Sequence, residues 1–219
     1  MAVSKKLRNK RGYKQTVGNF SSCKMNTSIW YDSALKRDFM YWLEFDPDVA
    51  CYTTPAISFD YYQSGKLKHY IPDFQVVRHQ KKQIIDVRSR KTILGDRYKR
   101  VYHQLLGMCN ETGWEFIALS ELEVRKEPIF SNIKLLYRYA RESFSIDEYK
   151  NCLEVIGSHL PASLADIYQI LDHHKIPRNV LLKLIFCSSV KIDLKQPIQL
   201  DSVITAVSEK IDWERIFNV

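Results

Sequence analysis

The chain has 219 residues, of which 45% are hydrophobic and 26% are charged, and its formal net charge is +8. This length allows one large domain or two small ones, and the composition is that of an ordinary globular protein. The chain contains no run of about 18 apolar residues, so no membrane span is expected. Its five cysteines form no CxxC pair that would indicate a zinc site. We expect a cytoplasmic protein with no membrane partner, and the positive charge favours nucleic acid or an acidic protein as partner.

Residues 1–24 are expected to form a basic N-terminal arm. The first 14 residues contain no acid, and their cations are Lys5, Lys6, Arg8, Lys10, Arg11 and Lys14. Such a block of like charge is usually disordered and often lies on phosphates. We expect these side chains to contact DNA, with a tail that only improves solubility as the alternative.

Residues 25–143 are expected to form an α/β domain with a mixed sheet flanked by helices. The first helix begins at a capping Asp32 or Ser33, carries apolar residues at helical spacing and ends before Pro47. A turn at Ser64-Gly65 separates the first two strands. The expected elements are a helix over 32–45, strands over 57–62, 68–77 (interrupted near Pro72) and 83–87, a helix over 97–113, a strand over 115–119 and a helix from 131 or 132 to 139.

Residues 144–219 are expected to form a small winged-helix domain. Three short helices over 146–160, 164–171 and 180–187 precede a hairpin with strands over 190–194 and 198–200. A plain helical cap on the first domain is the alternative. Lys183, Lys191 and Lys195 give this region basic character, but acids lie among them, so protein contact fits as well as DNA contact.

The clearest chemical pattern is Pro72-Asp73 followed, after a hairpin, by Asp86-Val87-Arg88. Metal-dependent cleavage of a phosphodiester needs hard oxygen ligands for magnesium and a cation near the scissile phosphate. Asp86 and Arg88 share one face of a strand because they are two residues apart, and Asp73 can meet them across the hairpin. This layout resembles the PD-(D/E)xK nucleases, with Arg in place of the usual Lys. The alternative interpretation is that Asp73 merely follows Pro72 in a turn, and that Asp86 and Arg88 form an ion pair on the surface.

Arg97, Lys99 and Arg100 begin the helix that follows this motif. We expect them to contact the DNA backbone near the acids, which would make binding strongly dependent on salt. A solvated helix face is the alternative.

Several phrases along residues 25–141 resemble the TnsA family, the endonuclease subunits of heteromeric transposases. They are Leu43-Glu44-Phe45-Asp46-Pro47-Asp48-Val49, Pro55, Gly65-Lys66, Tyr70-Ile71-Pro72-Asp73-Phe74, Gly113-Trp114-Glu115-Phe116 and the run from Asn132 to Tyr139. The resemblance implies a restriction-endonuclease-like fold, to which the winged helix adds the family's second domain. It also implies a bacterial, cytoplasmic protein that joins the nucleoid during transposition.

The same resemblance implies an activity and partners. TnsA cuts double-stranded DNA at the 5′ side of transposon ends with Mg²⁺ or Mn²⁺, while a TnsB-like transposase acts on the 3′ side. A TnsC-like AAA+ ATPase binds the C-terminal region of TnsA. The family's metal-binding acids fall on Asp73 and Asp86, its motif lysine falls on Arg88, and its helix Glu falls on Lys36.

Two positions depart from the family pattern. Lys36 is a cation, so it cannot bind magnesium, and Asp32, one helical turn earlier, either replaces the missing acid or pairs with Lys36. Arg88 keeps the positive charge and can contact phosphate, but it stays protonated and is a poor general base. Three interpretations are open: an active endonuclease with Asp32, Asp73, Asp86 and Arg88 at its site; a degenerate subunit that binds DNA and partners without cutting; and a winged-helix DNA-binding adaptor.

Overall fold

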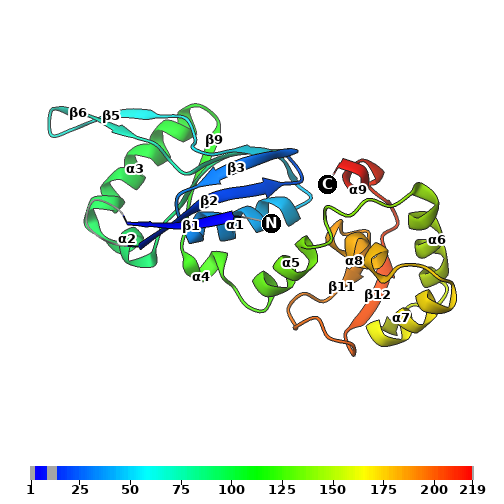
Figure 1. The fold of residues 1–219 in the computed structure, drawn as a ribbon. Helices are drawn as coiled ribbons and strands as arrows, with labels where there is room; N and C mark the ends of the chain where they lie inside the picture. The colour runs from blue at the N-terminus through cyan, green and yellow to red at the C-terminus, as the bar shows by residue number, and fades with distance from the viewer. Residues whose placement is uncertain (1–2, 9–13, 219) are drawn as a thin grey trace. The chain divides into compact units, whose positions relative to one another are not determined.

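The computed structural model describes residues 3–8 and 14–218. The chain divides into two compact units, Met1–Lys126 and Glu127–Val219, which are coloured from blue to green and from green to red in Figure 1. Both units contain helices and strands, so the chain is a mixed α/β protein. Within the described residues, no helix is long and apolar enough to cross a membrane.

The main sheet of the first unit has four strands in the order β4-β7-β8-β9. The pairs β4–β7 and β7–β8 are antiparallel, whereas β8 and β9 run parallel. The parallel pair is joined by a helical crossover, as parallel strands require. The strands are β4 (Val49–Thr53), β7 (Phe74–Arg78), β8 (Lys82–Val87) and β9 (Trp114–Leu119).

Two helices cover opposite faces of this sheet. Helix α1 (Ala34–Phe45) begins where the Ser33 side chain accepts the Lys36 amide, and it packs Phe39 edge-on against Phe74. Helix α3 (Asp96–Glu111) packs against a core that includes Ile84. The next residue along the strand, Ile85, pairs with Phe74, which contacts α1. Because successive strand residues point to opposite faces, α1 and α3 lie on different sides. The short helices are α2 (Arg90–Leu94) and α4 (Glu121–Val124).

A two-stranded ribbon is inserted between β4 and β7. It consists of β5 (Phe59–Gln63) and β6 (Lys66–Tyr70), and the predicted turn at Ser64-Gly65 is present, with positive φ at both residues. Phe59 and Tyr61 pack on one face of the ribbon into the α3 core, and Figure 1 shows the turn extending away from the main sheet. The strand expected over 68–77 is thus two strands, β6 and β7, separated at Pro72.

The N-terminal region differs from the expected arm. The strands β1 (Val3–Arg8), β2 (Lys14–Ser22) and β3 (Thr27–Tyr31) form an antiparallel sheet in the order β1-β2-β3. Phe20 is buried and packs edge-on against Tyr41 of α1, which ties this sheet to the first unit. Lys10 and Arg11 lie outside the described residues, and the side chains of Lys5, Lys6, Arg8 and Lys14 are likewise not described.

The second unit begins with a helix that the sequence had placed in the first domain. A ring contact joins Tyr137 of α5 (Ile129–Tyr137) to Phe186 of α8 (Arg178–Phe186), and Lys183 of α8 donates to the carbonyl of Glu142 at 2.7 Å. The chain therefore divides at Lys126, whereas the expected boundary was at 143. The other elements are α6 (Ile146–Gly157), β10 (Ala162–Ser163), α7 (Leu164–His173), α8 (Arg178–Phe186), β11 (Val190–Ile192), β12 (Val203–Val207) and α9 (Trp213–Asn218).

The sheet of this unit has the order β10-β12-β11, and both of its pairings are antiparallel. Its hairpin corrects one expectation, because the second strand is β12 and not 198–200. The segment before β12 is held as a loop by Asn132, whose side chain donates to the carbonyls of Leu194 and Gln196 and accepts from the amide of Ile198. Within the expected strand 198–200, the Gln199 amide donates to the Ser202 hydroxyl and the Leu200 carbonyl accepts the Ala165 amide. These groups and the Ile198 amide are therefore used outside a hairpin ladder.

Candidate functional site

Asp73 and Asp86 meet at one end of the main sheet. Asp73 precedes β7 and Asp86 lies near the end of β8, and these strands are antiparallel, so the two acids share an edge. Asp86 Oδ1 accepts the backbone amide of Asp73 at 3.2 Å, and Asp73 Oδ2 accepts the amide of Val87 at 2.8 Å. The convergence that the sequence predicted is therefore present, and backbone hydrogen bonds fix it.

Two tyrosine hydroxyls hold the second oxygen of Asp86. Tyr70, the last residue of β6, donates to Oδ2 at 2.5 Å, and Tyr98 of α3 donates to the same atom at 2.8 Å. Asp86 is fully buried, so these donors replace the water that an exposed carboxylate would bind. Burial is the main cause that raises the pKa of both tyrosines, and the neighbouring Asp86 raises them further, which keeps the hydroxyls protonated as donors.

Asp73 faces two cations. Its Oδ1 lies 2.7 Å from the Lys36 ammonium and 3.3 Å from the Arg88 guanidinium. Lys36 also lies 2.7 Å from Oδ1 of Asp32, so it bridges the two acids, and Arg88 lies 3.6 Å from Asp86. All five residues that the sequence assigned to the catalytic site are thus in one network, in which Lys36 connects Asp32 to Asp73.

Burial and charge oppose each other in this network. Burial raises the pKa of Asp73, although Arg88 and Lys36 act in the opposite direction. At Arg88 burial works to lower the pKa, but the carboxylates of Asp73 and Asp86 outweigh it and raise the pKa. The guanidinium therefore stays charged in all ordinary conditions, and it provides a fixed cation beside both acids.

The oxygens of Asp73 and Asp86 are the hard ligands that Mg²⁺ prefers, but their surroundings do not fit the ion. Each of the four oxygens has a protein donor or cation as partner, through Lys36, Arg88, two tyrosines and two backbone amides. Among the described residues, no three His, Cys, Asp or Glu side chains are grouped to hold a metal. As arranged here, the site balances its carboxylates with side-chain cations.

The basic residues of α3 lie beside this network and do not join it. Arg97, Lys99 and Arg100 are exposed, and Lys99 lies 3.9 Å from Asp96 in a long ion pair. Tyr98 lies between them in the sequence but points the other way, to Asp86. Their exposure leaves them accessible to a phosphate backbone.

Sequence reasoning missed Tyr70 and Tyr98 as members of the site. A weak signal for Tyr98 was available, because Tyr98, Val101, Leu105 and Cys109 recur at helical spacing and form the buried face of α3. A tyrosine on such a face needs a partner for its hydroxyl, and a buried carboxylate is one. Which carboxylate it meets depends on how α3 crosses the sheet, and no local pattern in the sequence specifies that crossing.

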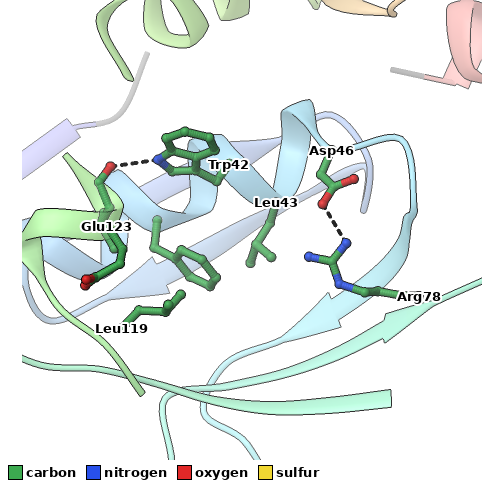
Figure 2. A pocket seen from close by; sticks show the side chains of 8 residues that line it. Trp42, Leu43, Asp46, Arg78, Leu119 and Glu123 are labelled. Atoms are coloured by element: carbon green, nitrogen blue, oxygen red, sulfur yellow. Dashed lines mark hydrogen bonds and ion pairs between the residues drawn. The ribbon is translucent and has the colours of Figure 1, made fainter. Parts of the chain in front are cut away.

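A separate cavity lies in the first unit and contains none of the predicted site residues. It has a volume of about 180 Å³, and Figure 2 shows its lining by Trp42, Leu43, Asp46, Arg78, Leu119 and Glu123. The Trp42 indole donates to the Val124 carbonyl at 2.7 Å, and Arg78 pairs with Asp46 at 2.5 Å. The polar groups at its rim are thus already paired within the protein.

No protein-family model matches this chain, and no curated protein matches it either.

Proposed function

We propose that this chain is a TnsA-like subunit of a heteromeric transposase. In this role it binds double-stranded DNA at transposon ends with a TnsB-like transposase and a TnsC-like AAA+ ATPase. The observation that carries the proposal is the meeting of Asp73 and Asp86 at one end of a mixed sheet, with Arg88 beside both. Burying two carboxylates side by side is costly, so their presence together supports a site of nuclease ancestry.

The order of elements around the two acids supports a restriction-endonuclease-like domain. Helix α1 and strands β4, β7 and β8 come first, then helix α3 and the parallel strand β9. The sequence predicted α1, β7, β8, α3 and β9 in this order but not β4, and the first strand that it expected, over 57–62, is β5 of the ribbon. The acids lie where β7 begins and β8 ends, which leaves the basic residues of α3 near the same edge.

The second unit has the order of a winged helix, but its third helix is a poor reader of DNA. The helices α6, α7 and α8 precede the hairpin β11–β12. A recognition helix must present its side chains to the major groove. In α8 the residues from Val180 to Phe186 are all buried, including Lys183, which is 2% exposed. We therefore assign this unit to protein contacts, and the interpretation as a winged-helix DNA-binding adaptor is the weakest of the three.

Between a cutting and a non-cutting subunit, the geometry favours the second. The oxygens that would bind magnesium are engaged, and Lys36 lies where the family has a carboxylate. Removal of Lys36 from Asp73 would leave a buried acid with one cation fewer, which is unfavourable. We infer that the chain is catalytically degenerate, and that Arg88 and the α3 cations serve DNA binding. An active Mg²⁺-dependent endonuclease is the alternative that the following experiment excludes or establishes.

The experiment combines binding and nicking on labelled transposon-end DNA, with Mg²⁺ or Mn²⁺ and with the transposase partner present. We expect binding without nicking, and no change in the products when Asp73→Ala replaces the wild type. Nicking by the wild type that is lost in Asp73→Ala, while the variant stays folded and still binds end DNA, would establish the endonuclease. An affinity for end DNA no higher than for unrelated DNA, with no binding to the transposase, would refute the proposal as a whole.

A second measurement tests the cations of α3. In a variant with alanine at positions 97, 99 and 100, the slope of log affinity against log salt concentration should become shallower by roughly 0.9 for each phosphate that the variant no longer neutralises. The variant replaces Arg97, Lys99 and Arg100, all of which are exposed, so folding should be unaffected. Equal slopes for the two proteins would remove these residues from the DNA interface.

A further inference from the structure

The position of Lys36 is defined at both ends of its side chain. Its amide is bound by the Ser33 cap at the start of α1, so its place in the first helical turn is fixed. Its ammonium lies 2.7 Å from Asp32 and 2.7 Å from Asp73, and the side chain is 14% exposed. A lysine held in this way is a bridge between two acids, and not a mobile surface charge.

The charges around Lys36 match those around a divalent ion. Asp73 is 2% exposed and Asp86 is fully buried, and two adjacent buried carboxylates cannot both ionise without compensating charge. Lys36 lies against Asp73 Oδ1, and Arg88 lies near Oδ1 of both Asp73 and Asp86, so two positive charges face the two acids. A bound Mg²⁺ would supply the same total charge, so the pair Asp73 and Asp86 needs no metal for electrical balance.

We propose that Lys36, together with Arg88, is a built-in replacement for a divalent cation, and that Lys36→Glu converts the network into a metal site. The inference rests on the nuclease ancestry in the proposed function. Lys36→Glu removes one charge of the replacement and places a carboxylate beside Asp73. With Arg88 as the remaining cation, the acids then repel each other unless a further cation binds, and their oxygens suit Mg²⁺ or Mn²⁺.

The test is the thermal unfolding of the full chain in EDTA, Mg²⁺ and Mn²⁺, with direct titration of Mn²⁺ by calorimetry. The wild type should have the same Tm in all three conditions and bind no Mn²⁺ at the acids. Lys36→Glu should lose about 10 °C in EDTA. It should regain about 8 °C when Mn²⁺ reaches roughly 100 times its Kd.

Two control variants separate the site from general charge effects. Lys66→Glu makes the same charge change at an exposed residue of the ribbon, and it should neither lower Tm appreciably nor respond to Mn²⁺. Lys36→Met removes the cation without adding a ligand, so it should lower Tm and gain less from Mn²⁺ than Lys36→Glu. If Lys36→Glu does not fold in EDTA, its refolding yield with Mn²⁺ against EDTA provides the same comparison.

Stabilisation of the wild type by Mn²⁺ would overturn the inference, because a filled site has no place for the ion. A Lys36→Glu variant that gains nothing from Mn²⁺, or no more than Lys36→Met gains, would overturn it as well. Neither readout involves DNA. If the metal test fails while the chain still binds end DNA, only the proposal that Lys36 and Arg88 replace a divalent cation is rejected. If the metal test succeeds but the chain does not bind end DNA, only the transposase proposal is rejected.

Discussion

Glu44 offers the sharpest test of what holds the first unit together. This α1 residue is fully buried, and its Oε1 accepts the hydroxyls of Ser22 at 2.5 Å and of Tyr52 at 2.7 Å. Its Oε2 accepts the backbone amides of Cys23 and Lys24, both at 2.9 Å. One side chain thus joins the turn after β2, the helix α1 and the strand β4. We expect Glu44→Leu to break these connections and Glu44→Gln to retain most of them.

The size of each effect follows from the donors. A buried donor that loses its acceptor lowers the free energy of unfolding by about 1–3 kcal/mol. Glu44→Leu leaves two hydroxyl donors and two backbone amide donors without an acceptor. The hydroxyls of Ser22 and Tyr52 can pair with each other, so the expected destabilisation is about 3–6 kcal/mol. In Glu44→Gln the amide oxygen still accepts the backbone donors, and its NH₂ group donates to the hydroxyl oxygens. That variant should lose only about 1–2 kcal/mol.

Urea unfolding followed by tryptophan fluorescence measures this difference. Three tryptophans, Trp30, Trp42 and Trp114, lie in the first unit and report on it. Glu111→Leu, at an exposed position of α3, is the matched control and should change the free energy of unfolding by no more than about 0.5 kcal/mol. Equal destabilisation by Glu44→Gln and Glu44→Leu, or destabilisation below about 1 kcal/mol by Glu44→Leu, would refute this account of the hydrogen bonds.

Two further predictions concern single hydrogen-bonded groups. Tyr98→Phe removes one hydroxyl from Asp86, and the free energy of unfolding should fall by about 1.5–3 kcal/mol in a urea titration; no change would mean that Asp86 does not depend on this donor. Glu148 accepts the amide and hydroxyl of Ser145 in the capping box of α6, and the amide bond is the main cause that lowers its pKa below 4.5. Its contribution is therefore complete above pH 4.5 and is lost as the pH falls through the lower folded-state value, so the stability difference between wild type and Glu148→Gln should shrink in acid. A difference that is constant from neutral pH to well below 4.5 would contradict this assignment.

The elements that the sequence predicted well are those with strong local signals. Helix α1 has a Ser33 cap, an apolar stripe and a proline just beyond its end, and the ribbon has a Ser64-Gly65 turn that takes positive φ at both residues. The meeting of Asp73 and Asp86 also followed from local rules. It required only that adjacent strands be antiparallel and that the acids lie near their ends.

What the sequence did not predict depends on contacts between distant residues. The first 24 residues were interpreted from their charge, but β2 buries Phe20 against Tyr41, and such pairing is visible only when α1 is in place. In the second unit, Lys183 contributed to the expected basic character, yet α5 covers α8, and the ammonium donates to the Glu142 carbonyl. A long apolar stem makes this burial possible, and the amino-acid type alone suggests the opposite.

The two acids have structural roles that are independent of a metal, and this changes which residues identify an active chain. Asp73 links α1 to the end of β8 through Lys36 and the Val87 amide. Asp86 links β8 to the ribbon and to α3 through two tyrosine hydroxyls. Replacement of either acid would disturb several elements at once, so a chain that does not cut has a structural reason to contain both. Under the proposed function, a cutting chain would therefore differ from this one above all at position 36. A carboxylate there would add a ligand for a divalent ion, whereas Lys36 and Arg88 occupy the acid oxygens with their own charge.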